Sequence, residues 1–179
     1  TIQTRVGRFA AALSSARVSA VGAFELEIEG LLKHMGMPQA SFKLRLSQTE
    51  TLPKDGMDRL VFLFNANRGH ELKPLSDVAS GGEISRVMLS IKAMITQKNL
   101  LPTIIFDEID NGISGDVAGR VGDVLLRTAS RMQVIAITHL PQIAGKAGTQ
   151  YSVFKNLSAG TTVSGIRQLG PEERVEELA

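Results

Sequence analysis

The chain has 179 residues, of which 43% are hydrophobic, so it is the size of one domain, or a large part of one, with a sizeable core. Twenty Lys and Arg against 18 Asp and Glu leave a net charge of only +2, and the absence of cysteine excludes disulfides and Cys-ligated metals. No apolar run approaches the ~20 residues that a membrane helix needs, and the N-terminus lacks a signal-peptide pattern, so we expect a cytoplasmic protein without membrane contact.

Apolar residues recur every three or four positions at the start of the chain and predict a helix about 30 residues long, or roughly 45 Å. They are Val6, Phe9, Leu13, Ala16, Ala20, Phe24, Ile28, Leu31 and Met35. Gly36 and Pro38 predict where the helix ends. The helix can be the end of a longer coiled coil, but packing against a core is the favoured interpretation for most of its length.

The first 20 residues also carry Arg5, Arg8 and Arg17 and no acidic residue. Contact with nucleic acid is one interpretation of this weak basic patch. A solvated helix face is the other, and charge alone favours it.

The rest of the chain alternates between strand and helix patterns. Strands are predicted near 42–46 and 60–64, joined as a hairpin, with mostly loop over 65–78. A helix follows at 84–98, with its apolar side formed by Ile84, Val87, Met88, Ile91 and Ile95. Short strands at 103–106 and 133–138, both predicted to be buried, flank a helix at 116–128, and a hairpin over 151–155 and 161–168 precedes a helix that begins at Pro171. This order predicts an α/β fold: a parallel sheet with crossover helices and flanking antiparallel hairpins.

Ser80-Gly81-Gly82-Glu83 precedes the helix predicted at 84–98. A helix N-terminus has unpaired N–H groups and a positive partial charge, and glycines allow a phosphate to approach them closely. The same residues also fit an ordinary capping box, with Ser80 as the cap and Glu83 three positions later. Taken alone, the pattern favours the cap.

Asp107 and Glu108 come directly after the apolar strand at 103–106, and His139 follows the next predicted strand. Side chains at the carboxyl ends of parallel strands can reach a ligand in the same crevice. One carboxylate can hold Mg²⁺ and the other can activate a water, while the histidine can hydrogen-bond a phosphate. The alternative is that all three are simply solvated at strand ends.

A tight loop at 111–115 follows the two carboxylates and contains Ser114 between glycines. Its glycines can serve turn geometry alone, which is the favoured interpretation of the loop by itself. Because it lies beside the acidic pair, the loop is also a candidate contact across a subunit interface.

The order and spacing of these segments resemble the ATP-binding-cassette ATPases, and among them the head domains of the structural-maintenance-of-chromosomes (SMC) type. Residues 79–86 resemble the signature motif, 106–115 the Walker B motif and D-loop, and 138–144 the switch-histidine segment. The resemblance implies that Asp107 assists Mg²⁺, that Glu108 is the catalytic base and that His139 senses the γ-phosphate of ATP. It also implies a role in DNA double-strand-break repair and recombination, on the bacterial nucleoid.

The resemblance further implies a division of the ATP site between two heads. Ser80, Gly81 and Gly82, with Glu83 beside them, would complete the ATP site of a second copy of the head in trans. Ser114 would lie at that head–head interface.

The chain departs from the family in having no phosphate-binding P-loop of the form Gly-x-x-x-x-Gly-Lys-Ser/Thr. Gly145-Lys146-Ala147 does not fit, because Ala147 replaces the hydroxyl and Leu140 replaces the first glycine. We therefore expect the C-terminal half of a split head, with a coiled-coil end at 1–36 and the head lobe at 37–179. Its expected partners are its own N-terminal P-loop lobe, a second head and DNA, and it should be inactive alone.

Two other interpretations stay open. The chain can be a non-enzymatic interaction module in which the glycine-rich segment only caps a helix. It can also be part of another ATP-binding-cassette head, such as that of a transporter or of a different chromosome-maintenance protein.

Overall fold

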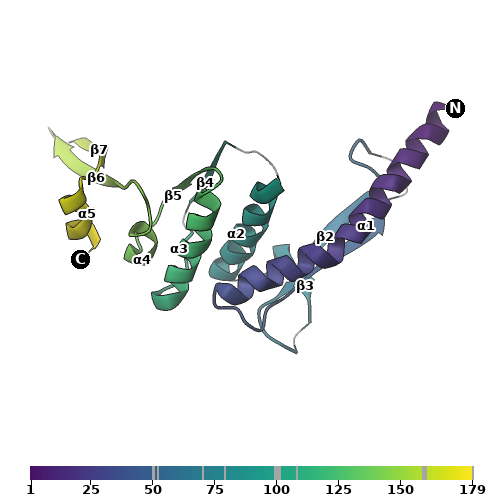
Figure 1. Cartoon of the computed structure of the whole chain (residues 1–179), viewed down its shortest axis with the longest axis horizontal. Coiled ribbons are helices and arrows are strands. Elements are labelled where there is room, and N and C mark those ends of the chain that lie inside the picture. Colours follow the sequence, from purple (N-terminus) through teal and green to yellow (C-terminus); the bar gives the residue numbers. More distant parts are fainter. Residues whose placement is uncertain are drawn as a thin grey trace. The chain divides into compact units, whose positions relative to one another are not determined.

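The computed structural model of the chain describes residues 1–49, 51, 53–69, 71–78, 80–98, 102–107, 109–158 and 161–178. Glu108, Ala79 and the turn predicted at 159–160 lie outside these residues. The chain divides into two compact units, Thr1–Lys98 and Asn99–Ala179, which are taken separately below (Figure 1). The assignment of residues 1–36 and 37–179 to different roles stays a prediction.

The first unit begins with a long helix, α1 (Ile2–His34), which confirms the predicted helix. It ends at Gly36, whose φ of 82° is in the left-handed region that favours glycine. The N–H of Gly36 donates to the carbonyl of Lys33 at 3.3 Å, and the N–H of Met37 donates to that of Leu32 at 2.9 Å. This pair of bonds is a Schellman motif, and Leu32 and Met37, the two positions that commonly make its hydrophobic contact, are both buried.

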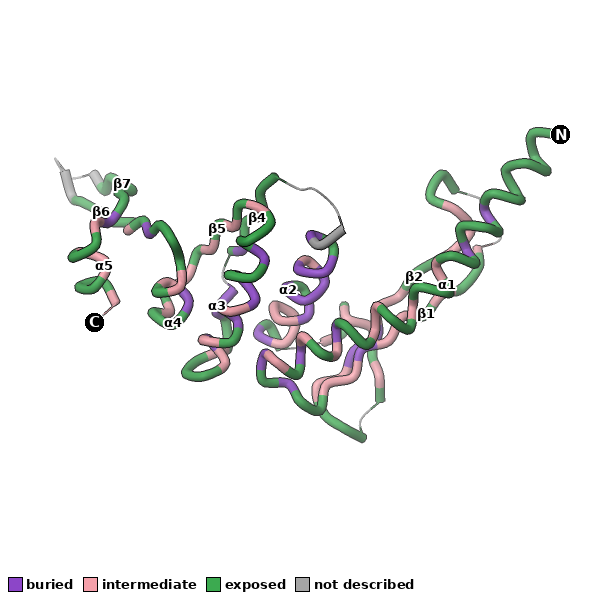
Figure 2. Tube along the Cα trace, in the orientation of Figure 1, coloured by how far each residue is buried: buried purple, intermediate pink, exposed green. Residues whose placement is uncertain are grey.

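The prediction that α1 packs against a core for most of its length is wrong. The buried residues of the helix are Ala10, Ser14, Ile28 and Leu32, and most of its N-terminal half is exposed (Figure 2). The predicted apolar positions Val6, Phe9 and Leu13 are exposed, and the guanidinium of Arg8 lies over the ring of Phe9 at 5.6 Å. The reason is geometric, because the hairpin that packs on α1 bonds it between Ser14 and Glu29.

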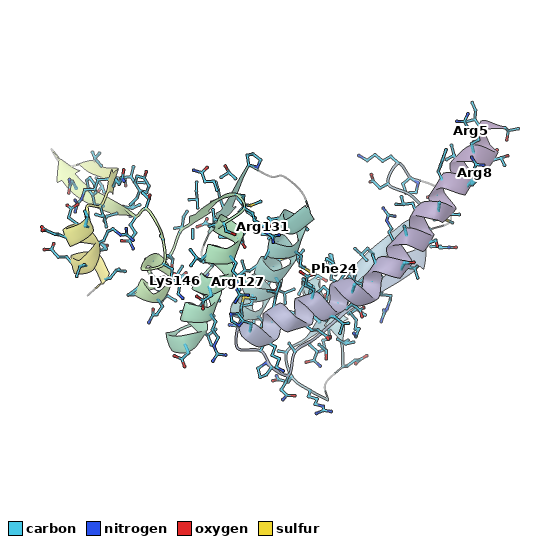
Figure 3. The ribbon with its side chains drawn as sticks, in the orientation of Figure 1. Arg5, Arg8, Phe24, Arg127, Arg131 and Lys146 are labelled. Carbon is cyan, nitrogen blue, oxygen red and sulfur yellow. The ribbon has the colours of Figure 1, made fainter. Side chains whose placement is uncertain are left out.

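That hairpin consists of β1 (Ser41–Gln48) and β2 (Asp58–Asn65), which pair in antiparallel fashion as predicted. A short strand β3 (Lys73–Pro74) pairs with β2, and a 3₁₀ turn, Leu75–Asp77, follows it in a segment predicted to be mostly loop. The fully buried ring of Phe42 is the centre of this packing. Its centroid lies 6.2 Å from Phe24 of α1 and 5.8 Å from Phe62 of β2, and Figure 3 shows Phe24 on the part of α1 beside the hairpin.

Two glutamates of α1 satisfy the outer edge of β1. Glu29 accepts the N–H of Phe42 at 2.9 Å, and Glu25 accepts the N–H of Leu44 and the ammonium of Lys43, both at 2.8 Å. Burial raises the pKa of Glu25, but the bonds from Lys43 and Leu44 outweigh it and hold that pKa below its usual value. The helix therefore covers a strand edge that would otherwise present free N–H groups.

At the other end of the hairpin, Asp58 joins β2 to α1. It accepts the hydroxyl of Ser14 at 2.6 Å and the guanidinium of Arg17 at 2.9 Å. These two bonds, that of Ser14 first, hold the pKa of Asp58 below its usual value. Arg17 is thus used inside the unit, whereas Arg5 and Arg8 lie on the exposed N-terminal part of α1 (Figure 3).

The second helix of this unit, α2 (Gly81–Lys98), is present, but its predicted apolar side is only partly correct. Met88 and Ile95 are exposed, whereas the buried positions are Val87, Leu89, Ser90, Ile91, Ala93, Met94 and Thr96. The apolar pattern misses Ser90 and Thr96 because their hydroxyls donate to carbonyls of the same helix, of Arg86 at 2.9 Å and of Ala93 at 2.7 Å. A hydroxyl satisfied in this way can be buried in a helix.

The second unit contains the predicted parallel pair. Strands β4 (Thr103–Phe106) and β5 (Gln133–Ala136) pair in parallel and are joined through α3 (Gly115–Ala129), the expected crossover helix. Helix α3 buries one side along its length, formed by Ala118, Val121, Gly122, Val124, Leu125 and Thr128. This β–α–β arrangement confirms the predicted α/β fold class.

Contrary to the predictions, β4 is not buried on both faces and β5 is only partly covered. Phe106 is buried, but Ile105, Ile135 and Ile137 are 58%, 43% and 55% exposed (Figure 2). Ile105 and Ile135 are paired in the register, and Ile137 lies two residues beyond Ile135, so all three belong to one face. The described residues place no second layer on this apolar face, as a parallel sheet normally requires.

The unit continues with α4 (Pro141–Ala144), β6 (Tyr151–Ser158), β7 (Thr161–Gln168) and α5 (Pro171–Leu178). The antiparallel pairing of β6 with β7 confirms the predicted hairpin. Gly165 stands opposite Phe154, whose ring lies over it, since a Cβ at position 165 would be 2.5 Å from the ring. Tyr151, Val153 and Ile166 form an exposed apolar face of this hairpin.

By length and composition, α1 meets the criterion for a membrane span, with a mean hydropathy of 1.2 over its best window. This finding qualifies the expectation that no such segment exists. The signal is weak, because the polar side chains of Ser14, Arg17 and Glu25 on this helix bind the β1–β2 hairpin.

Candidate functional site

Ser80 stands directly before α2 and caps it. Its hydroxyl oxygen accepts the N–H of Glu83 at 3.4 Å, and its carbonyl accepts the N–H of Ile84 at 3.1 Å. In this cap the hydroxyl of Ser80 uses only its oxygen, as an acceptor. Because Ser80 is exposed, its O–H proton can still be donated to a ligand. The capping interpretation and the phosphate interpretation are therefore compatible.

The glycines that follow leave the start of α2 accessible. Gly81 is exposed, and a Cβ placed on it would meet no atom within 4 Å, whereas Gly82 is buried. The space over Gly81 is thus not filled by the chain itself. A ligand or partner can approach the helix N–H groups there without displacing a side chain.

The sheet of the second unit brings Asp107 and His139 to the same edge. Asp107 is exposed and follows β4 directly, and Glu108 lies outside the described residues. The N–H of Ile137 donates to the carbonyl of Phe106 at 2.9 Å, which continues the pairing one residue beyond β5. The segments that carry Asp107 and His139 consequently leave adjacent parallel strands side by side.

Asp110 ties these two segments together. Its Oδ2 accepts the hydroxyl of Thr138 at 2.5 Å and the backbone N–H of His139 at 2.7 Å, and it lies 3.1 Å from Nδ1 of the His139 ring. Burial raises the pKa of Asp110, but the bonds from Thr138 and His139 outweigh it and hold the pKa below its usual value. The carboxylate therefore stays ionised while buried.

Asp110 is the site residue that sequence reasoning did not single out. The sequence shows it only as a third acid in the segment that also holds Asp107 and Glu108, with no spacing that links it to His139. A weak signal was available, because Asp110 follows the apolar Ile109, which is buried in the structure.

The loop after Asp110 has the turn geometry that its glycines predict. Gly112 and Gly115 have φ values of 71° and 53°, in the region that favours glycine. Ser114 precedes α3 in the N-cap position, is exposed and makes no side-chain capping bond. Its hydroxyl is therefore not used by the helix, which leaves it suitable for contact with a partner.

A shallow cavity of about 470 Å³ lies between α3 and α4. It is lined by Gly115, Asp116, Gly119, Arg120, Asp123, Gln142 and Lys146. An ion pair between Lys146 and Asp123 crosses it, and Figure 3 shows Lys146 after α4. No predicted site residue lines this cavity, so we place the candidate site at the sheet edge instead.

The donor set at that edge suits a metal that is shared with a nucleotide. Among the described residues, no group of three or more His, Asp or Glu side chains is placed to hold a metal ion. Mg²⁺ in nucleotide sites is commonly held by one or two carboxylates, with phosphate oxygens and water completing its shell. The exposed carboxylate of Asp107 fits that arrangement.

Comparison with solved structures identifies the class of fold. An Smc head domain from Pyrococcus yayanosii superposes with a TM-score of 0.67 at 23% identity, over 88% of this chain and 28% of that one. An Smc head bound to the C-terminal winged-helix domain of ScpA gives 0.65 at 22%, over 96% and 49%. A structure from work on ATP-driven dimerisation of SMC ATPases gives 0.60 at 21%, over 92% and 94%. The chain has the fold of an SMC head domain.

Curated relatives identify the protein family. The DNA repair protein RecN of Deinococcus radiodurans is 43% identical over 149 residues, which cover 83% of this chain and 26% of that protein. RecN of Rickettsia typhi is 37% identical over 178 residues (99% and 32%), and RecN of Bacillus subtilis 42% over 131 residues (73% and 23%). The chain belongs to the RecN family, whose C-terminal part it matches, and it spans about a quarter to a third of the length of these relatives. No protein-family model matches it.

Proposed function

We propose that this chain is the C-terminal part of an ATPase head that hydrolyses ATP with Mg²⁺ when two heads join, in DNA double-strand-break repair and recombination. The observation that carries the proposal is the placement of Asp107 and His139 at one edge of a parallel pair, with Asp110 joining their segments. Similarity to RecN proteins supplies the setting in DNA repair. We place the protein in the cytoplasm, on the nucleoid.

In this proposal, Asp107 assists Mg²⁺, Glu108 is the general base and His139 contacts the terminal phosphate. Bound ATP and Mg²⁺ supply the phosphoryl group and the charge that neutralises it; the chain contributes a carboxylate, a base and a histidine at fixed positions. The exposed hydroxyl of Ser114 and the exposed Ser80 and Gly81 at the start of α2 are offered to a second head, with Glu83 and the buried Gly82 in the same first turn.

The exposed apolar face formed by Ile105, Ile135 and Ile137 supports the expectation of a missing P-loop lobe. A parallel sheet is normally covered on both faces, and this chain contains no P-loop. We propose that the N-terminal lobe of the same protein completes this part of the head. The chain alone should therefore neither hold ATP tightly nor hydrolyse it.

The exposed stripe formed by Ile2, Val6, Phe9 and Leu13 supports a coiled coil that enters the head through α1. These residues alternate at steps of four, three and four, as the seam of a coiled coil does. DNA contact by the full protein, directly or through other parts, completes the proposed set of partners.

The test is ATP turnover by full-length RecN that contains this segment, by this chain alone, and by full-length Glu108→Gln. We expect turnover in the first only, with ATP binding kept by Glu108→Gln and turnover lowered by ~10²–10⁴-fold, as for the loss of a positioned base. Robust hydrolysis by this chain alone would contradict the split head, and unchanged turnover in Glu108→Gln would remove Glu108 from its role.

A second candidate is an interaction module in which Ser80 only caps α2, through its bond with Glu83. Ser80→Arg in the full-length protein separates the two. Loss of nucleotide-dependent dimerisation supports the ATPase head, whereas dimerisation that is unaffected supports the module.

A further inference from the structure

The buried carboxylate of Asp110 determines which nitrogen of His139 carries a proton. The side chain of Asp110 is 3% exposed and that of His139 is 76% exposed, with Oδ2 3.1 Å from Nδ1. An ionised carboxylate has no proton to donate, so Nδ1 must be the donor in this contact. Nε2 is then the ring nitrogen that remains for a ligand.

This assignment constrains what His139 can bind. With one proton, on Nδ1, the ring has a lone pair on Nε2 and accepts a hydrogen bond there. A phosphate oxygen also only accepts. Contact between Nε2 and a phosphate therefore takes a second proton on the ring, and the carboxylate of Asp110 supplies the balancing negative charge.

We propose that Asp110 is the positioning residue of His139: it holds the ring by Nδ1 and supports the doubly protonated form, which donates from Nε2 to the terminal phosphate of ATP. The inference rests on the proposed function and adds a residue and a protonation state to it. The bonds from Thr138 and from the backbone of His139 fix Asp110 against the segment that it orients.

The first test is steady-state ATP hydrolysis by full-length RecN carrying Asp110→Asn. The amide is nearly isosteric, and its oxygen in place of Oδ2 can still accept from Thr138, from the backbone N–H of His139 and from Nδ1. It is neutral, however, so it cannot balance a second proton on the ring, and Nε2 is then left without a proton to donate. We expect kcat to fall by roughly 10²-fold or more with little change in KM, as when a histidine loses its orienting carboxylate. Asp110→Glu, which keeps the charge, should recover part of the loss.

Thr138→Val is the matched control. It removes one hydrogen bond to the same Oδ2 but leaves the contact between Asp110 and His139. If Asp110 only ties two loops together, Asp110→Asn and Thr138→Val should lower kcat to a similar extent, and this result would overturn the proposal. A much larger effect of Asp110→Asn supports it.

The second test does not depend on turnover. ¹⁵N-histidine spectra of full-length RecN are recorded with a non-hydrolysable ATP analogue, and the His139 signals are identified by their loss in His139→Gln. We expect both ring nitrogens of His139 to be protonated in the wild type and only one in Asp110→Asn. A bare Nε2 in the wild-type complex would overturn the proposal, even if Asp110→Asn does not fold. Wild-type protein that neither binds nor hydrolyses ATP would instead remove the proposed function, and this inference with it.

Discussion

Asp58, Asp110 and Glu25 are carboxylates that accept hydrogen bonds from other elements of their own unit. The bonds from Ser14 and Arg17 lower the pKa of Asp58, and for Asp110 and Glu25 such bonds outweigh the burial that raises it. The three side chains join α1 to the hairpin in the first unit and β4 to β5 in the second. Folding is thus linked to their ionisation.

The sign of this linkage predicts acid sensitivity. A group whose pKa is lowered in the folded state stabilises it above its unfolded pKa, and that stability is lost as pH falls through the folded value. With ordinary values of 3.8 for Asp and 4.5 for Glu, the loss should begin below about pH 4.5. Urea unfolding of the chain between pH 7 and pH 3 measures this loss of stability.

Asp58→Asn should lower the free energy of unfolding at pH 7 and make it depend less on pH in the acid range. Asp116 is an exposed acid on α3, and its replacement in Asp116→Asn should do neither.

At the scale of elements, α1 depends on how its end is made and on which of its side chains cover the hairpin. The Schellman motif at Gly36 needs a left-handed residue, whereas Gly22 lies on the exposed side of the helix with open space around it. Two glycines within about fifteen residues therefore have opposite roles.

Replacing these glycines by alanine should have opposite effects on stability. Gly36→Ala places a Cβ at a φ of 82° and should destabilise the chain by ~1–2 kcal/mol. Gly22→Ala removes backbone freedom from the middle of the helix and should stabilise it by ~0.5–1 kcal/mol. Chemical unfolding of the two variants beside the wild type measures both changes. If both substitutions changed the free energy of unfolding in the same direction, α1 would not end in the Schellman motif at Gly36.

The edge of β1 provides a second element-scale prediction. Glu25→Ala removes the acceptor for the N–H of Leu44 and for Lys43, and should cost ~1–3 kcal/mol because the partly buried groups lose their partner. Glu176→Ala, at an exposed position of α5, is the control and should change stability by less than about 0.5 kcal/mol. A Glu25→Ala effect as small as that of the control would contradict the role of α1 in covering this strand.

Much of the element pattern could be predicted from sequence, because local signals agree with the fold. Gly36 ends α1, Pro171 starts α5, and apolar runs mark β4 and β5. Burial was predicted less well. Ser90 and Thr96 are buried through bonds to their own helix, and Val6 and Phe9 have no layer over them. Periodicity shows which residues share a face, but not whether anything covers that face.

The candidate site was predicted in its residue types but not in its connections. Asp107 and His139 were expected at one edge because they follow strands that pair in parallel, and the register confirms that topology. The link through Asp110 depends on side-chain positions 28 and 29 residues apart along the chain, which no local pattern encodes. The catalytic roles of Asp107, Glu108, His139, Ser80 and Ser114 stay predictions.

At the scale of the whole molecule, the exposed apolar face of the β4–β5 pair should become buried in the full-length protein. Ile135→Lys should change the stability of this chain by less than about 0.5 kcal/mol, because the side chain is 43% exposed here. In full-length RecN, the same change should bury a charge and be strongly destabilising. Thermal unfolding of both proteins tests this, with Val18→Lys on the exposed part of α1 as the control. Equal, small effects in both proteins would mean that no lobe covers this face.

The central claim is that this chain contributes to two different ATP sites: Asp107, Glu108 and His139 to one, and Ser80 to Gly82 to that of a second head. Mixing full-length Ser80→Arg with full-length Glu108→Gln tests it most directly. Each variant alone should be inactive. If sites are shared across a two-fold dimer, each heterodimer has one intact site of its two, so mixing should restore turnover, to about a quarter of wild type where half of the dimers are heterodimers. No recovery on mixing, with heterodimers shown to form, would contradict the account.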